Sequence, residues 1–375
     1  MFAAYEAREG SSHMNETTTH EDDTTSETST NADEQAIQEG IEQVIGQINK
    51  RIRKGDIPPT LMKQALNNAF SDALRQMAAP TTLDYSVRDL LGDYWTQVRK
   101  RRDTASTGFA QLNEILSGGI EAKRLVVVLG APNTGKTTFV HQVSDHIADS
   151  GRPVLYVTSE DGPAELVAKT LARIGSINYT AVLKGYESEE KKINLALARQ
   201  QDRASSDRLR YLDASSGITM DILREKAREH FTRYDEAHGG GPGVLVVDYL
   251  QRVARSIKAR SGLSSDLREV VTMLTEQLRA LANELNCGVI VIASQHRGGY
   301  KRGEDSSSLA SAKESGDIEY TADVLMALSE DEKRMAPIPM TAVNLFIDKN
   351  RQGKKSKSIA FDFWPDRQQF TEVAK

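Results

Sequence analysis

A glycine loop that ends in a lysine and a hydroxyl residue is the part of the sequence best suited to chemistry. Residues 126–140 read VVVLGAPNTGKTTFV, so an apolar run leads into the loop and an apolar helix start follows it. The spacing Gly-x-x-x-x-Gly-Lys-Thr lets backbone N–H groups converge on phosphate oxygens at a helix N-terminus. The predicted phosphate site consists of Gly130, Ala131, Pro132, Asn133, Thr134, Gly135, Lys136, Thr137 and Thr138. The alternative is an ordinary glycine-rich turn with a surface lysine.

Two acidic positions could complete such a site. Lys136 can reach the β- and γ-phosphates of a nucleotide, and the Thr137 hydroxyl can bind Mg²⁺. Asp248 ends the apolar run GVLVVDYLQ, where a carboxylate can hold the Mg²⁺ water shell beside the loop. Glu160, after the run VLYVTSED, can orient an attacking water, with Asp161 as its rival. The alternatives are a turn or cap residue for Asp248 and acids of a helix N-terminus for the other two.

The elements that must position these residues begin near residue 105. Short β-branched runs alternate there with amphipathic helical patterns, the clearest of which covers residues 267–285. Such alternation predicts an α/β fold with a mainly parallel sheet covered by helices on both faces. The predicted strands are RLVVVLG, PVLYVTSE, RLRYLDAS, GVLVVDYLQ, GVIVIASQ and DVLMALS. Residues 341–370 predict two further strands joined by a basic turn.

The chain before residue 104 differs from the rest in composition and in the spacing of its apolar residues. Residues 1–13 lead into GSSHM, which is typical of an expression vector, so we interpret them as a tag and Met14 as the native start. Residues 14–34 are acidic, rich in threonine and poor in apolar residues, which predicts disorder. Three apolar stripes at helical spacing predict a small helical module over 35–103, and residues 104–375 form the α/β domain.

Composition excludes some classes of protein. The single cysteine, Cys287, rules out a disulfide within the chain and favours a reducing cytosolic compartment. No apolar run reaches the roughly 18 residues that would predict a membrane span, so no membrane partner is expected. The formal charge of -5 is too mild to decide for or against nucleic acid.

Two basic segments follow predicted strands and are interpreted as loops. They read QRVARSIKARSG over 251–262 and QHRGGYKRGED over 295–305. Cations without many base-reading groups suit sequence-independent binding of a single strand. The candidate DNA-binding residues are Arg252, Arg255, Lys258, Arg260, Arg297, Tyr300, Lys301 and Arg302. The alternatives are mobile solvated loops and, for the tyrosine, packing on the core.

Several motifs together resemble one family. Glu160, VVDYLQ, LRALANELNCGVIVIASQ, KESGDIEYTAD and DKNRQG occur in an order and spacing similar to the C-terminal motor domain of DnaB-type replicative helicases, over about residues 105–372. The resemblance implies a RecA-like P-loop NTPase core and a hexameric ATP-dependent helicase that moves on single-stranded DNA and unwinds duplex in replication. ATP and Mg²⁺ are the implied cofactors.

The resemblance also implies individual roles. Phosphate and magnesium contacts fall to Lys136, Thr137 and Asp248, and catalytic roles to Glu160, Lys136, Gln295, Lys349 and Arg351. Gln295 would sense the γ-phosphate, and the last two would reach the nucleotide of a neighbouring subunit. The alternative for the basic pair is a solvated hairpin.

The pattern departs from the family in its N-terminal part. Only about 70 helical residues precede the motor, with residues 83–102 as a linker helix, which leaves primase binding unassigned. The implied partners are single-stranded DNA, other copies in a ring, and a helicase loader or other replication protein. The basic loops are not close copies of the bacterial ones, which favours a phage, plasmid or mobile-element version in a bacterial or phage-infected cytosol. Two other functions stay open: a RecA-like packaging, recombination or clock-type ATPase, and a nucleotide-gated regulatory module.

Overall fold

The structure is a computed structural model that describes residues 87–92, 94, 104–238, 241–261, 266–294, 316–351, 353 and 358–374. The chain divides into two compact units, Met1–Leu91 and Gly92–Lys375. The predicted tag, disordered segment and first two helices lie outside the described residues. Of the predicted linker helix, the structure describes α3 (Val87–Gly92) and Tyr94, with Val87 and Leu91 exposed.

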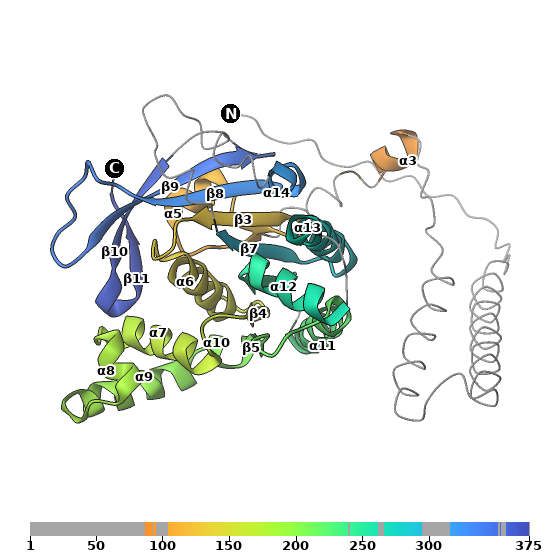
Figure 1. Ribbon diagram of the computed structural model, residues 1–375. Coiled ribbons are helices and arrows are strands. Elements are labelled where there is room, and N and C mark those ends of the chain that lie inside the picture. Colours follow the sequence, from red (N-terminus) through yellow and green to blue (C-terminus); the bar gives the residue numbers. More distant parts are fainter. Residues whose placement is uncertain are drawn as a thin grey trace, which may run out of the picture. The chain divides into compact units, whose positions relative to one another are not determined.

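A nine-stranded sheet forms the centre of the described α/β domain. Its order is β11-β10-β9-β8-β3-β7-β6-β4-β5. The strands from β8 to β5 are parallel, whereas β9, β10 and β11 are antiparallel additions at one edge (Figure 1). The bounds are β3 Leu125–Gly130, β4 Val154–Thr158, β5 Leu209–Asp213, β6 Val244–Asp248, β7 Gly288–Ser294, β8 Val324–Glu330, β9 Thr341–Asn350, β10 Ser358–Trp364 and β11 Gln369–Glu372. The pairing from β8 to β5 confirms the predicted parallel sheet. The β-branched runs of β3, β4 and β6 are buried on both faces, as the centre of such a sheet requires.

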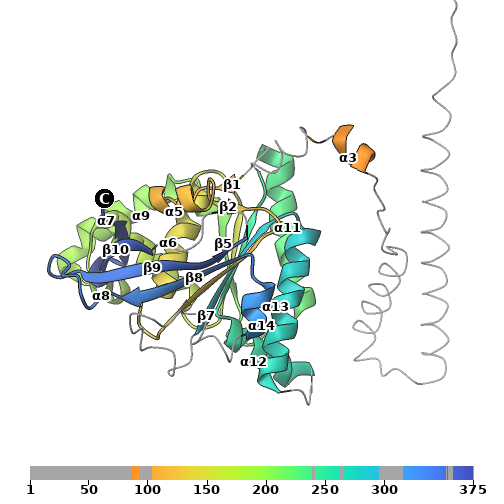
Figure 2. The same ribbon diagram turned by 90° about the horizontal axis from the view of Figure 1, so that it is seen from above.

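Helices cover both faces of the sheet, as Figures 1 and 2 show. On one side lie α6 (Lys136–Asp149), α7 (Pro163–Gly175), α8 (Tyr179–Lys184), α9 (Glu190–Gln201) and α10 (Ser205–Arg208). On the other lie α11 (Met220–His238), α12 (Leu250–Ser261), α13 (Leu267–Glu284) and α14 (Gly316–Thr321). Smaller elements are β1 (Thr104–Ala105) paired with β2 (Ile120–Glu121), α5 (Ala110–Ile115), and the 3-10 turns Glu187–Glu189 and Pro365–Arg367. None of the helices in the described segments is long and apolar enough to cross a bilayer.

The two faces of the sheet carry separate cores. On the α6 side, aromatic rings pack across the domain: Phe139 stacks on Phe109 and contacts Phe361 and Phe370 edge-on. This cluster joins the helix that follows the glycine loop to the antiparallel strands near the C-terminus. The opposite face buries the apolar stripe of α13, whose bounds agree with the predicted helix over 267–285.

Two expectations about local structure are wrong. Residues 250–261 form a helix, α12, and not a loop. Its buried residues Leu250, Val253, Ala254 and Ile257 fall at helical spacing and pack on the sheet, a stripe that the basic residues between them obscured. The C-terminal part has a third strand, β11, beyond the two predicted, because the chain turns back after Trp364 and pairs with β10.

Candidate functional site

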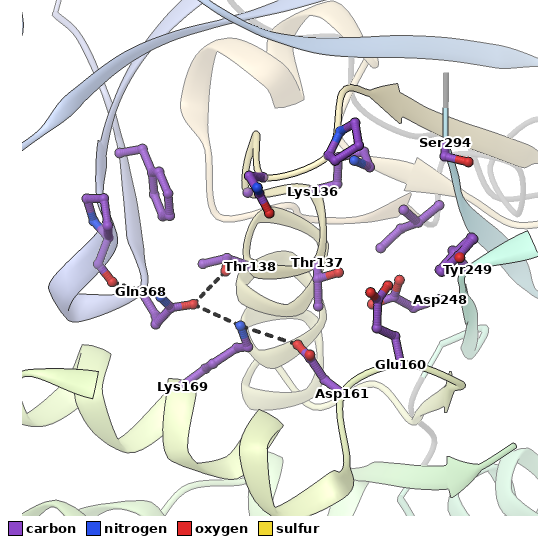
Figure 3. A pocket seen from close by; sticks show the side chains of 16 residues that line it. Lys136, Thr137, Thr138, Glu160, Asp161, Lys169, Asp248, Tyr249, Ser294 and Gln368 are labelled. Atoms are coloured by element: carbon purple, nitrogen blue, oxygen red, sulfur yellow. Dashed lines mark hydrogen bonds and ion pairs between the residues drawn. The ribbon is translucent and has the colours of Figure 1, made fainter. Parts of the chain in front are cut away.

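A cavity of about 430 Å³ opens where the parallel strands end (Figure 3). Gly130 and Ser294 are partners at the ends of β3 and β7, and Thr158 and Asp248 are partners at the ends of β4 and β6. Side chains that follow these strands therefore converge at one edge of the sheet. The cavity is lined by Pro132, Asn133, Gly135, Lys136, Thr137, Thr138, Glu160, Asp161, Lys169, Asp248, Tyr249, Ile292, Ser294, Phe363, Pro365 and Gln368.

The glycine loop has the conformation that its residue types require. Asn133 and Gly135 have positive φ angles of 66° and 81°, a region that glycine and asparagine tolerate best. A Cβ at Gly130 would lie 2.8 Å from the carbonyl oxygen of Leu328, so a side chain there would clash with backbone. Helix α6 begins at Lys136, directly after the loop. The loop thus presents its backbone to the cavity in front of a helix N-terminus, which attracts anions.

Lys136 extends along this loop. Its Nζ donates to the carbonyl oxygen of Ala131 at 2.5 Å, and Thr134 donates its hydroxyl to the same oxygen at 2.9 Å. Burial lowers the pKa of Lys136, an effect that Asp248 and Glu160 partly offset. Among the described residues the ammonium has only this neutral carbonyl as a hydrogen-bond acceptor, so an anionic phosphate would be a better partner for it.

Asp248 is the most deeply buried acid of the cavity. Its Oδ2 accepts a hydrogen bond of 2.7 Å from the Tyr156 hydroxyl, and its Oδ1 is buried without a hydrogen-bond partner among the described residues. Burial raises the pKa of Asp248 to about 6, although the hydroxyls of Tyr156 and Thr137 favour the charged form. A cation beside Thr137 would satisfy the orphaned oxygen and remove the cost of burying the charge.

The structure separates the two rival acids after β4. Asp161 forms an ion pair with Lys169, at 3.3 Å. Glu160 is exposed, lines the cavity and makes no hydrogen bond or ion pair within the described residues. Figure 3 shows Glu160 next to Asp248 and facing Thr137, whereas Asp161 points away toward Lys169. Glu160 is therefore the acid whose carboxylate remains available at the phosphate end.

The other end of the cavity uses residues that sequence reasoning missed. Gln368, at the turn between β10 and β11, accepts hydrogen bonds on its Oε1 from Thr138 at 2.7 Å and Lys169 at 3.0 Å. Phe363 and Pro365 of the same hairpin also line the cavity. No signal in the sequence identified this group, because about 230 residues separate Gln368 from Thr138 and only tertiary packing joins them.

Lys349 and Arg351 lie near the ends of the strands that are opposite the cavity. Leu328 pairs with Gly130, whereas Lys349 pairs with Leu325 near the other end of β8. The Lys349 Nζ donates to the carbonyl oxygens of Glu319 and Tyr320 at 2.6 and 3.1 Å, and Arg351 donates to that of Tyr320 at 2.8 Å. The pair therefore caps the C-terminus of α14 and is remote from the cavity of its own chain.

The candidate DNA-binding residues divide into two sets. Arg297, Tyr300, Lys301 and Arg302 lie outside the described residues, after Ser294 at the end of β7, and so does Gln295, the predicted γ-phosphate sensor. The other four are on α12 and do not line the cavity. Arg252 donates to the carbonyl oxygen of Ser159 at 2.6 Å and Arg260 to that of Ser216 at 2.5 Å, which anchors the two ends of the helix. Arg255 and Lys258 are the ones left without a hydrogen bond or ion pair in the described part of the chain.

The side chains that line the cavity fit a nucleoside triphosphate with Mg²⁺. The orphaned Asp248 oxygen, the Thr137 hydroxyl and the ammonium of Lys136 line one cavity at a helix N-terminus. Oxygen donors suit Mg²⁺, and the loop N–H groups and lysine suit phosphate.

The chain is similar to known proteins at moderate sequence identity. The chain is 28% identical to the replicative DNA helicase DnaB of Pasteurella multocida over 231 residues, which are 60% of this chain and 46% of that protein. It is 27% identical over 229 residues to the replicative DNA helicase DnaC of Bacillus subtilis, covering 60% of this chain and 47% of that protein. The chain thus spans about half the length of the curated relatives it matches.

Solved structures support the fold. The ATPase domain of G40P superposes with a TM-score of 0.65 at 19% identity, covering 78% of this chain and all (100%) of that domain. A DnaB-like replicative helicase, solved in a study of its interactions with primase, gives a TM-score of 0.68 at 18% identity, covering 93% of this chain and 79% of that one. This likeness confirms the RecA-like α/β fold that the family resemblance implied for the chain.

One segment of the chain contains the glycine loop, all nine strands of the sheet and the acids at the ends of β4 and β6. Residues 105–372 match the family model for the DnaB-like helicase C terminal domain, and the chain therefore belongs to this family.

Proposed function

We propose that this chain is the motor of an ATP-dependent DNA helicase, which hydrolyses ATP in the cavity at the ends of the parallel strands and moves along single-stranded DNA. One observation carries the proposal: Lys136, Thr137, Glu160 and Asp248 line a single cavity at the N-terminus of α6. These residue types are the ones that phosphoryl transfer to water requires.

Each of these residues has a distinct role. Lys136 leaves the Ala131 carbonyl and binds the β- and γ-phosphates, and the loop N–H groups hold the same oxygens. Thr137 and Asp248 hold Mg²⁺, which when bound neutralises charge that develops on the phosphates. Glu160, the acid without a partner among the described residues, orients the attacking water and accepts its proton.

Lys349 and Arg351 act on a neighbouring copy. Lys349 pairs with Leu325, three residues or about 10 Å along β8 from Leu328 beside the loop, and Arg351 follows the Asn350–Val324 pair, which is about 13 Å from Leu328. Neither residue serves the cavity of its own chain. An arginine supplied in trans stabilises transition-state charge and makes hydrolysis depend on assembly. A closed ring gives every cavity such a donor, which supports the hexamer that the resemblance implies.

Helix α3 supports the proposed assembly as well. Val87 and Leu91 of α3 are exposed apolar side chains, and so are Leu183 on α8 and Leu195 on α9. We infer that α3 of one copy packs on the α8–α9 surface of the next. Association would then bury apolar side chains that the single chain leaves in water.

The nucleic acid partner is single-stranded DNA. Arg255 and Lys258 of α12 offer cations that are not engaged within the described part of the chain, and the basic residues 297–302 follow β7. Cations that contact phosphates bind a strand without reading its sequence. A loader or another replication protein, and Mg²⁺ with ATP, complete the set of proposed partners.

The deciding experiment combines hydrolysis with strand separation. We expect ATPase activity that single-stranded DNA stimulates and ATP-dependent unwinding of a forked duplex, with Glu160→Gln binding ATP but failing in both assays. Stimulated hydrolysis without unwinding would instead indicate a RecA-like packaging or recombination ATPase. Unchanged behaviour of Glu160→Gln would indicate a nucleotide-gated regulatory module.

A further inference from the structure

A tyrosine contacts the metal-side carboxylate from inside the sheet. Tyr156 lies in the middle of β4 and pairs with Val246 on β6, and Asp248 follows two residues later on the same face of β6. The Tyr156 hydroxyl donates to Asp248 Oδ2 at 2.7 Å, and both side chains are buried. A polar ring at this position is unusual in β4, whose other strand residues before Thr158 are aliphatic.

The ring of Tyr156 has little freedom to move. His141 of α6 packs edge-on against it with centroids 5.8 Å apart, and Tyr211 of β5, its partner in the sheet, does so at 6.0 Å. His141 is itself fixed by a hydrogen bond of 2.8 Å between its Nε2 and the Tyr211 hydroxyl. Burial raises the pKa of Tyr156, so its hydroxyl stays protonated and acts as a donor.

This contact decides which oxygen of Asp248 is free. Oδ2 is engaged by Tyr156, whereas Oδ1 has no hydrogen-bond partner among the described residues. A carboxylate held at one oxygen by a rigid donor cannot rotate freely, so its other oxygen keeps a constant direction within the cavity. Donors behind a metal ligand commonly act in this way, and their loss weakens metal binding about 10- to 100-fold.

We propose that Tyr156 is a positioning residue that orients Asp248 toward the Mg²⁺ of the bound nucleotide. The inference rests on the proposed function, because it requires Mg²⁺ beside Thr137. A positioning role differs from a packing role in the group that it requires. The hydroxyl of Tyr156 orients Asp248, whereas the ring alone would be enough to pack the core.

The chain provides a matched control for that distinction. Tyr211 is a second, partly buried tyrosine next to Tyr156, and its hydroxyl bonds His141 and not Asp248. Tyr156→Phe and Tyr211→Phe each remove one hydrogen-bonded hydroxyl from the same cluster. A loss of packing or stability should therefore affect both variants, whereas a loss of metal positioning should affect only the first.

The experiment measures binding of a fluorescent non-hydrolysable ATP analogue to the full chain over a series of Mg²⁺ concentrations, starting in EDTA. For Tyr156→Phe we expect the Mg²⁺ concentration for half-maximal enhancement of binding to rise about tenfold. Tyr211→Phe should match the unmodified chain. Binding in EDTA, which depends on the loop and Lys136, should be equal in all three and shows that the pocket is folded.

The outcomes distinguish a failure of the positioning role from a failure of the proposed function. Equal Mg²⁺ dependence in Tyr156→Phe and the unmodified chain would overturn the positioning role and leave the proposed function intact, and so would an equal shift in both variants. If Mg²⁺ did not enhance analogue binding to the unmodified chain, the proposed function would fail first and the inference with it.

Discussion

Asp161 and Lys169 form an ion pair at 3.3 Å inside the nucleotide cavity, while Glu160, one residue before Asp161, has no hydrogen bond or ion pair within the described residues. Figure 3 shows that the two side chains point in different directions, Glu160 toward Asp248 and Asp161 toward Lys169. The ammonium of Lys169 also donates to Gln368, so Asp161 belongs to a chain of contacts that reaches the C-terminal hairpin. This relationship assigns different tasks to two adjacent carboxylates.

The first prediction compares the two acids. Glu160→Gln removes the group that we propose orients and deprotonates water, so we expect kcat for ATP hydrolysis to fall about 10²-fold or more. Asp161→Asn removes a partly exposed ion pair, so kcat should change by about fivefold at most. Steady-state ATPase assays, with nucleotide affinity measured in parallel, check both values. A larger loss in Asp161→Asn than in Glu160→Gln would reverse the assignment.

The second prediction tests action in trans. Arg351→Ala should lower kcat for ATP hydrolysis about 10³-fold, because it removes an arginine proposed to act in trans. Nucleotide binding should stay nearly intact, because the guanidinium contacts Tyr320 at the strand ends opposite its own cavity. Lys136→Ala should also be inactive, since it lacks the phosphate-binding ammonium.

Mixing these two inactive variants provides the sharper measurement. In mixed rings, an intact cavity of an Arg351→Ala copy meets an intact arginine of a Lys136→Ala copy, so part of the ATPase activity should return. Each variant mixed with unmodified chain controls for subunit exchange. Mixed rings that form but stay inactive would show that Arg351 does not act across subunits.

The third prediction concerns α12. Arg255→Ala with Lys258→Ala should weaken binding of oligo-dT and reduce the slope of log K against log salt by about 1.4, or about 0.7 for each lost phosphate contact on a single strand. Arg228→Ala with Arg233→Ala, two exposed arginines of α11 that pair with Glu284 and Glu229, is the matched control. The slope is measured by fluorescence anisotropy. An unchanged slope in the α12 variant would assign DNA binding to other residues.

The fourth prediction is a pH dependence of stability. Burial, and secondarily the nearby Arg173, lower the pKa of His141 to about 3, while the unfolded chain protonates this histidine near pH 6.5. Between these values the unfolded state binds the additional proton. The stability that the folded state gains by holding His141 neutral is therefore complete above about pH 6.5. As pH falls below that value, the free energy of unfolding decreases by up to about 1.4 kcal/mol per pH unit.

Urea unfolding of the unmodified chain and of His141→Gln, at intervals from pH 7 to pH 5, checks this slope. Glutamine does not titrate, so the variant should lose less stability as pH falls, although the charges that face this site, Asp145, Arg173 and Lys169, remain in both proteins. Parallel curves for the two proteins would mean that His141 does not titrate differently in the folded and unfolded states.

The sequence by itself determined the six parallel strands, the glycine loop and the family, although it did not predict β11. These features are local: β-branched runs specify buried parallel strands, and a glycine loop before a lysine specifies a phosphate site wherever it is placed. The place of Glu160 and Asp248 in one cavity also followed from the sequence, since both come after strands whose ends meet at one edge.

Only the tertiary structure decided which groups act on each other across long separations. It showed that α12 is a helix, that the hairpin of Gln368 closes one end of the cavity, and that Asp161 is engaged by Lys169. It also placed Arg351 away from its own cavity and Tyr156 behind Asp248. These facts depend on strand order and on side-chain contacts between distant segments, and a local pattern of residue types carries no information about either.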